Sequence, residues 1–124
     1  MVKLDRPPVS PESHLPLTPA TFQILMALVD GERHGYAIMM EVEARSEGTV
    51  RLGPGTLYGS LKRLLDAGIV VNAGEGAHPK SADERRRYYR LTKFGLSVAR
   101  AEARRLEETV RTARRKKLIG LRPV

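Results

Sequence analysis

The residues of this sequence that could do chemistry are cations, small residues and one tyrosine in a short segment, Gly55–Arg63. If the leucines of this segment face inward in a helix, at about 100° per residue, its other side chains face outward. Small residues let a helix backbone approach DNA closely, and Lys and Arg reach phosphate oxygens or guanine edges. The expected DNA contacts of this segment are Thr56, Tyr58, Lys62 and Arg63.

A second group of cations precedes the tyrosine pair Tyr88 and Tyr89. Three consecutive arginines occupy positions 85–87, and one lysine lies in the polar stretch 74–84. Adjacent arginines repel each other unless an anion lies nearby, which favours contact with phosphate groups. Because side chains of a strand alternate between its two faces, we do not expect all three arginines to contact DNA. The expected contacts of this second group are Lys80, Arg86 and Arg87.

Groups for catalysis or metal binding are scarce. The chain has no cysteine, which excludes disulfides, thiolate zinc sites and cysteine nucleophiles. Its three histidines, His14, His34 and His78, are dispersed and have no metal-ligand spacing. His34 stands at the start of a predicted helix, where capping or packing is the expected role. We therefore expect no enzyme activity, no catalytic residue, no metal and no cofactor.

The positive charge is concentrated at one end of the chain. The whole sequence has 22 Lys and Arg against 14 Asp and Glu, but residues 85–124 alone carry 14 cations against three acids. A one-sided basic field favours a polyanion partner, usually nucleic acid, and the alternative is a solvated helix that keeps the protein soluble. No apolar stretch approaches the roughly 18 residues of a membrane helix, and no secretory signal is present. We expect a cytoplasmic protein of one domain.

Hydrophobic spacing predicts three helices and then two strands. Residues 1–17 contain four prolines and little to bury, which predicts a flexible arm. A first helix is expected over 19–29 after an N-cap at Thr18, with Phe22, Leu25, Met26 and Val29 on its buried face. A second helix over 34–46 is expected to bury Tyr36, Ile38, Met39 and Val42.

The third helix is expected within 52–65, with Gly68 ending it, and a β-hairpin of two strands is expected over 69–91. This order of elements is that of a winged helix-turn-helix, in which the third helix enters the major groove. The expected fold is mainly α with a small β-hairpin, that is, α+β. The winged helix-turn-helix spans residues 18–92.

A long final helix is expected over 93–119, followed by a tail at 120–124, with Thr92 as its N-cap. Its small and apolar residues alternate in steps of three and four, which is typical of a narrow seam for a partner helix. The alternative is that this helix folds back on its own domain. We expect a dimer seam made of Leu96, Ala99, Ala103, Leu106, Val110 and Ala113.

Three blocks of the sequence resemble PadR-family transcriptional regulators. Residues 31–38 (GERHGYAI) are similar to the opening G-x-x-H-G-Y of that family, and residues 55–64 (GTLYGSLKRL) resemble its recognition-helix pattern. Residues 86–95 (RRYYRLTKFG) are similar to its wing-to-helix signature. The blocks follow the family's order, and the length matches its smaller subgroup, which has a single C-terminal helix.

The resemblance implies a dimeric, ligand-responsive repressor that binds an inverted repeat in double-stranded DNA. It also implies that the first helix assists the C-terminal helix in dimerisation, where we expect Phe22 to contribute. A small-molecule effector is implied, and the absence of an aromatic residue after Gly95 disfavours a planar one. The alternative function is a winged-helix protein-interaction module or anti-repressor that does not bind DNA. RNA binding is disfavoured because no aromatic stacking platform is present.

Overall fold

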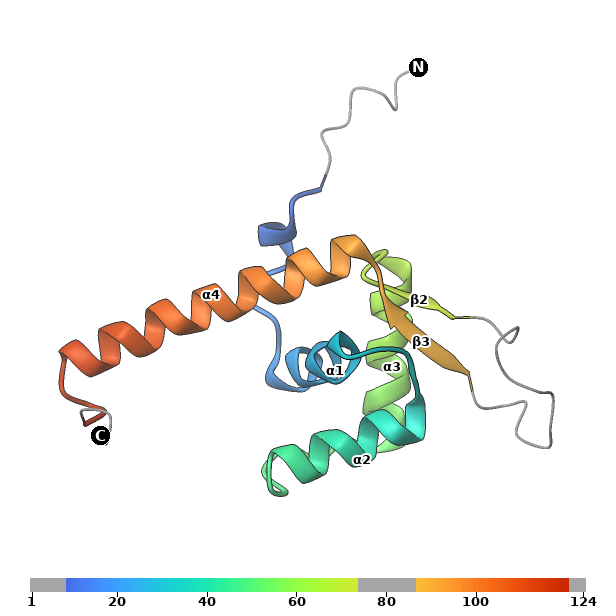
Figure 1. The fold of residues 1–124 in the computed structure, drawn as a ribbon, viewed down its shortest axis with the longest axis horizontal. Helices are drawn as coiled ribbons and strands as arrows, with labels where there is room; N and C mark the ends of the chain where they lie inside the picture. The colour runs from blue at the N-terminus through green and yellow to red at the C-terminus, as the bar shows by residue number, and fades with distance from the viewer. Residues whose placement is uncertain (1–8, 74–86, 121–124) are drawn as a thin grey trace, which may run out of the picture.

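The computed structural model describes residues 9–73 and 87–120, which form a four-helix winged-helix fold of the α+β class (Figure 1). The expected contacts Lys80 and Arg86 and the histidine His78 lie outside these residues. The elements are η2 (Pro11–His14), α1 (Pro19–Val29), β1 (Arg33–His34), α2 (Gly35–Arg45), α3 (Pro54–Asp66), β2 (Val70–Asn72), β3 (Tyr88–Leu91) and α4 (Lys93–Arg115).

The sheet has three antiparallel strands in the order β1-β3-β2. The predicted hairpin pairs Val70 with Leu91, and β1 adds Arg33 opposite Tyr89 on the other edge of β3. The sequence analysis did not anticipate β1, because a strand of two residues is too short to show an alternating pattern. This strand connects α1 to α2 and fixes the start of α2 beside the central strand.

The bounds predicted for α1 are confirmed, but of its predicted buried face only Leu25 is fully buried. The Thr18 side chain accepts a hydrogen bond from the Thr21 N–H at 3.1 Å, as an N-cap should. The buried residues are Ile24, Leu25, Ala27 and Leu28. Of the expected face, Phe22 and Met26 are only partly buried and Val29 is 51% exposed. Because α1 is apolar on both sides, its spacing alone could not decide which side enters the core.

Helix α2 begins where the sequence predicted. The His34 Nδ1 accepts a hydrogen bond from the Ala37 N–H at 3.2 Å, so this histidine is the N-cap of α2. Ile38 and Val42 enter the core as expected, whereas Tyr36 is 56% exposed, contrary to the prediction. Tyr36 lies in the first turn of α2, and its apolar ring made it resemble a core residue.

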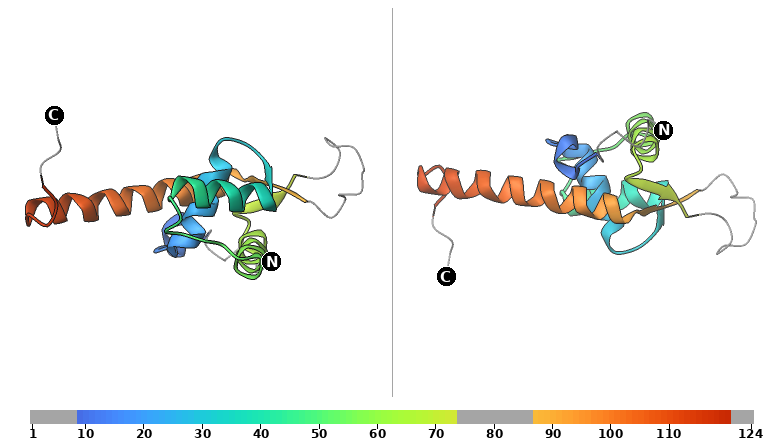
Figure 2. Two further views of the ribbon diagram at one scale, coloured as in Figure 1. Left: turned by 90° about the horizontal axis from the view of Figure 1, so that it is seen from below. Right: turned by 90° about the horizontal axis from the view of Figure 1, so that it is seen from above.

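The first turn of α4 approaches the end of α3 very closely. The Thr92 hydroxyl lies 2.7 Å from the Gly68 carbonyl oxygen and accepts a hydrogen bond from the Gly95 N–H at 2.9 Å. A Cβ at Gly95 would overlap the carbonyl oxygen of Ile69, so only glycine fits there. This junction fixes α4 to the winged helix, and from it α4 extends beyond the other helices (Figure 1 and Figure 2).

Helix α4 is shorter than the sequence predicted. It ends at Arg115 rather than at Ile119, because Lys117 adopts a left-handed conformation with φ of 64°. Its 23 residues extend about 35 Å at 1.5 Å per residue.

Part of the segment predicted as a flexible arm, residues 1–17, packs against the rest of the chain, since η2 contacts α4. Leu15 and Leu17 contact the hydrophobic core, and the His14 ring lies edge-on to Phe94 at 5.6 Å. The Leu17 backbone N–H donates to the carboxylate of Glu102, which is 1% exposed. Arg105 donates to both oxygens of this carboxylate, at 2.7 and 2.9 Å. Two leucines among prolines show no periodicity, so the sequence pattern could not predict this packing.

We predict that Glu102→Gln destabilises the protein by about 1–3 kcal/mol, because it removes a buried, charge-assisted contact. The Arg105 guanidinium holds the pKa of Glu102 below its usual range, so this contribution is complete above the unfolded pKa of roughly 4.3. It is lost as the pH falls through the lower folded value. Urea unfolding at several pH values measures both effects.

The control is Glu107→Gln, which removes an exposed carboxylate 3.8 Å from Arg111. It should cost less than about 0.5 kcal/mol. An equal loss for the two variants would contradict a special role for Glu102.

Candidate nucleic-acid interface

Helix α3 has one buried and one exposed side, as the sequence predicted. Leu57, Leu61 and Leu64 are buried in the core. Thr56, Lys62 and Arg63 are exposed on the other side, together with Gly55. The exposed side therefore has the shape and charge needed to approach a nucleic acid.

The first turn of α3 leaves backbone donors without partners from a capping side chain. Its N-cap is Gly53, which has no side chain to cap the helix, and Pro54 follows at the first helical position. Free N–H groups at the start of a helix favour an anion such as phosphate. This turn lies at the same end of the helix as Thr56.

The two cations of α3 differ in their surroundings. The Lys62 ammonium lies 3.7 Å from a carboxylate oxygen of Asp66, and both side chains are largely exposed. The Arg63 guanidinium has no carboxylate partner within the described residues, and its nearest polar contact is the Ser60 hydroxyl at 3.4 Å. Arg63 is therefore the cation of α3 that is more readily available to a ligand.

Tyr58 is less free than the sequence analysis expected. It is 47% exposed, but its ring and hydroxyl lie directly against Gly35, where a Cβ would overlap them. Burial raises the pKa of Tyr89, and the neighbouring Tyr58 phenol raises this pKa further. Tyr58 thus connects α3 to the start of α2 and to the central strand. In the sequence, Gly35 stands out only through its pairing with Tyr36. The contact of Gly35 with Tyr58 was not predicted.

The base of the hairpin adds two exposed cations, Arg87 and Arg90. Arg87 was an expected contact, and it directly precedes β3. Tyr88 and Tyr89 point to opposite faces of the sheet, and Tyr89 is the buried member of the pair. The His34 ring lies edge-on to Tyr88 at 5.3 Å.

The expected seam residues of α4 do not all share one environment. Ala99 is buried in the chain's own core, so it has little surface left for a partner. Leu96, Leu106 and Ala113 are partly buried, and Ala103 and Val110 are exposed. The expected interface residue Phe22 is partly buried, and it lies two turns before the exposed Val29 on the same side of α1.

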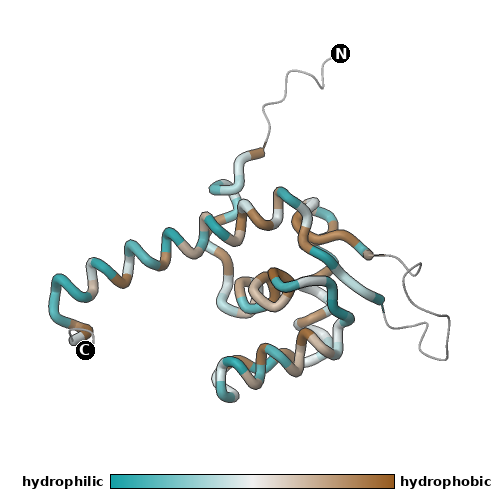
Figure 3. Tube along the Cα trace, viewed as in Figure 1, coloured by the Kyte–Doolittle hydropathy of each residue, from teal (hydrophilic) through white to brown (hydrophobic). Residues whose placement is uncertain are grey.

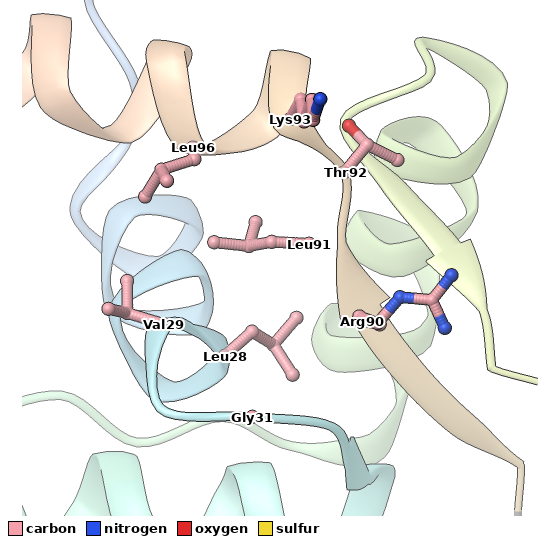
Figure 4. A pocket seen from close by; sticks show the side chains of 8 residues that line it. All are labelled: Leu28, Val29, Gly31, Arg90, Leu91, Thr92, Lys93 and Leu96. Carbon is pink, nitrogen blue, oxygen red and sulfur yellow. The ribbon is translucent and has the colours of Figure 1, made fainter.

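A hollow of about 240 Å³, lined by apolar residues together with Arg90, Thr92 and Lys93, lies between α1 and α4. Val29 of α1 and Leu96 of α4 both line it. In Figure 4 the side chains of Leu28 and Leu91 extend toward the space between α1, β3 and α4, whereas Arg90 extends away. The hollow, which Thr92 and Lys93 also line, therefore brings Val29 on the outward side of α1 close to Leu96 at the start of the seam.

Within residues 9–73 and 87–120, no group of three His, Asp or Glu residues is placed to hold a metal ion. None of the helices in this described part combines the length and apolar character that crossing a bilayer requires.

Comparison with known proteins places this geometry among transcriptional regulators. The model of the transcriptional regulator PadR-like family matches residues 24–101, from α1 into α4. The fold is similar to a transcriptional regulator from Clostridium thermocellum, with a TM-score of 0.63 and 24% identity, over 77% of this chain and 87% of that one. RosR from H. salinarum has a TM-score of 0.58 and 27% identity, over 85% and 89% of the two chains.

Two other similar proteins are longer than this chain. Bacillus subtilis PadR, solved in complex with operator DNA, has a TM-score of 0.55 and 20% identity, over 84% of this chain and 50% of its own. An uncharacterized 37.1 kDa protein in transposon TN4556 of Streptomyces fradiae is 39% identical over 84 residues. The match covers 68% of this chain but only 22% of that relative's length.

The contact between Gly35 and Tyr58 gives a prediction about packing. Gly35→Ala should destabilise the protein by about 1–3 kcal/mol, because the added methyl group overlaps the phenol ring. In a Tyr58→Ala background the same change should cost less than about 0.5 kcal/mol, since the ring is gone. Thermal unfolding of the four proteins in this double-mutant cycle measures the difference.

Gly59→Ala is the control, because the nearest atom to its added Cβ is an Arg63 guanidinium nitrogen at 3.8 Å. It should not destabilise α3, since alanine favours a helix by about 1 kcal/mol over glycine. If Gly35→Ala costs the same with and without the Tyr58 ring, the proposed contact is wrong.

Proposed function

This chain belongs to the PadR-like family of transcriptional regulators, a family of non-enzymatic proteins, and from that premise we propose that it is a ligand-responsive repressor. It binds an inverted-repeat operator as a homodimer. Residues 18–92 recognise the DNA, and the helix that begins at Lys93 pairs the two protomers. The observation that carries the proposal is the exposed side of α3. This side presents small residues and cations, and the opposite side of the helix buries Leu57, Leu61 and Leu64.

Direct reading of bases is assigned to α3. Arg63 is the strongest candidate, because a guanidinium without a carboxylate partner can bond both acceptors of a guanine. Thr56 lies at the start of the helix, where winged-helix proteins reach base edges. Lys62 contacts phosphate or a base edge once DNA displaces Asp66. Tyr58 contributes mainly by positioning, since its ring packs on Gly35.

Backbone contacts are assigned to the hairpin. Arg87 is exposed beside β3. Lys80 and Arg86, which lie outside the described residues, are proposed from the sequence to contact phosphate groups as well. Phosphate contacts fix register and orientation but carry no sequence information of their own.

Dimerisation is assigned to the apolar surface formed by α4 and the outward side of α1. Leu96, Leu106 and Val110 offer apolar area that the chain itself leaves partly uncovered. Phe22 and Val29 continue this surface across the hollow. Ala103 and Ala113 provide the small residues that let two helices approach. The ligand response is proposed from the family resemblance.

The experiment that tests this function begins with selection of duplexes from a random library by the wild-type chain. Affinities for a selected duplex and a random one are then compared for Arg63→Ala. We expect the free-energy gap between the two duplexes to narrow by about 1–3 kcal/mol, because a bidentate contact to guanine is lost.

Arg63→Lys is the matched control, since it keeps the charge but loses the planar fork. The Arg63→Lys variant should retain its affinity for random DNA but lose part of the free-energy gap between the two duplexes. Equal losses of Arg63→Ala on both duplexes would show that Arg63 contacts only phosphate. If the wild-type chain selects no sequence at all, the DNA-reading proposal fails and the protein-interaction alternative replaces it.

A further inference from the structure

Most of the positive charge that the sequence concentrates near its C-terminus lies on α4 and the two residues after it. Between positions 93 and 117 the chain has nine cations against three carboxylates. Helix α3, the element assigned to base reading, has only Lys62 and Arg63. The function proposed above therefore gives no role to the largest cluster of positive charge, which lies on α4 and the two residues after it.

Five of these cations form a single line along α4, which we call the basic ridge. At 3.6 residues per turn they fall within a sector of about 60°, roughly opposite the buried Val98 and Glu102. All five are exposed, and polar residues recur along the full length of the helix (Figure 3). From first to last they span about 33 Å at 1.5 Å per residue. The ridge consists of Lys93, Arg100, Arg104, Arg111 and Arg115.

The charge of the basic ridge is poorly compensated. Arg111 lies 2.9 Å from a carboxylate oxygen of Glu108, so this cation is paired. Lys93, Arg100 and Arg104 have no carboxylate partner in the part of the chain that the structure describes. Arginines four residues apart on a helix repel each other, so this arrangement costs stability unless an anion is bound.

The dimensions and chemistry of the ridge fit a DNA duplex. Its length of about 33 Å is close to one helical turn of DNA, about 34–36 Å. A membrane-binding helix needs an apolar face beside its cations, but the apolar face of α4 is directed toward the core and the predicted seam. An acidic protein partner would need buried apolar anchors, which the ridge does not offer.

We propose that the basic ridge of α4 is a second DNA-binding surface, which contacts backbone phosphates without reading sequence. It is separate from the exposed side of α3, and the C-terminal half of α4 lies beyond the other helices (Figure 1). The ridge therefore lets the protein hold a second duplex, or a second stretch of one duplex, while α3 occupies its target. This inference does not depend on base reading by Arg63.

The test uses the full chain with Lys62→Ala and Arg63→Ala, so that the contribution of α3 is reduced. Binding of a random-sequence 30-base-pair duplex is followed by fluorescence anisotropy over a range of salt concentrations. We expect this chain to retain salt-dependent binding. Adding R100E/R104E should weaken it at least about tenfold and reduce the salt slope by about two units, because two phosphate contacts are lost.

The matched control is K116E/K117E, which makes the same change in charge in the two residues after α4, next to Arg115 but not part of the ridge. It should change the affinity by less than about threefold. Circular dichroism checks that each variant folds, and R100Q/R104Q provides a milder change if the double reversal does not fold.

Equal weakening by the two charge reversals would overturn the inference, because it would show only a general effect of net charge. The absence of any weakening by R100E/R104E and R100Q/R104Q would also overturn it. So would binding of the ridge to anionic vesicles or polyglutamate in preference to the duplex. Failure of the Arg63 experiment, by contrast, concerns α3 alone and would leave this result standing.

Discussion

The geometry of this protein depends on the junction at Thr92, where one hydroxyl connects the end of α3 to the first turn of α4. It lies within hydrogen-bond distance of the Gly68 carbonyl at the end of α3 and caps the first turn of α4 through the Gly95 N–H. The Thr92 N–H also donates to the Ile69 carbonyl at 3.1 Å. These contacts fix the direction in which α4 leaves the winged helix. In a dimer paired through α4, that direction sets how far apart the two α3 helices lie.

The motif residues that resemble the PadR family act largely through packing. His34 caps α2, Gly35 makes room for the Tyr58 ring, and Gly95 makes room for the Ile69 carbonyl. These positions hold α2, α3 and α4 at close distances that a side chain would prevent. The exposed side of α3 is therefore presented by a rigid frame, while the residues on that side, such as Arg63, remain free to contact a ligand.

The sequence predicted the order of the four α-helices and of β2 and β3, because caps and periodicity are local signals, but it did not predict the short elements η2 and β1. Thr18, His34 and Thr92 each marked a helix start, and Gly68, with a φ of 76°, marked the end of α3. Side-chain burial was predicted less well where the choice depends on tertiary packing. For example, the outer side of α1 is as apolar as a core face, but in the structure Leu28 enters the core and Val29 is exposed.

The central claim is that two α3 helices, held apart by paired α4 helices, read an inverted repeat. A hydroxyl-radical footprint of the wild-type chain on a duplex that it selects tests this claim most directly. The account predicts two equivalent protected half-sites in inverted orientation, with centres about 34–36 Å apart or a multiple of that distance. A single protected half-site, or two half-sites in direct repeat, would contradict it.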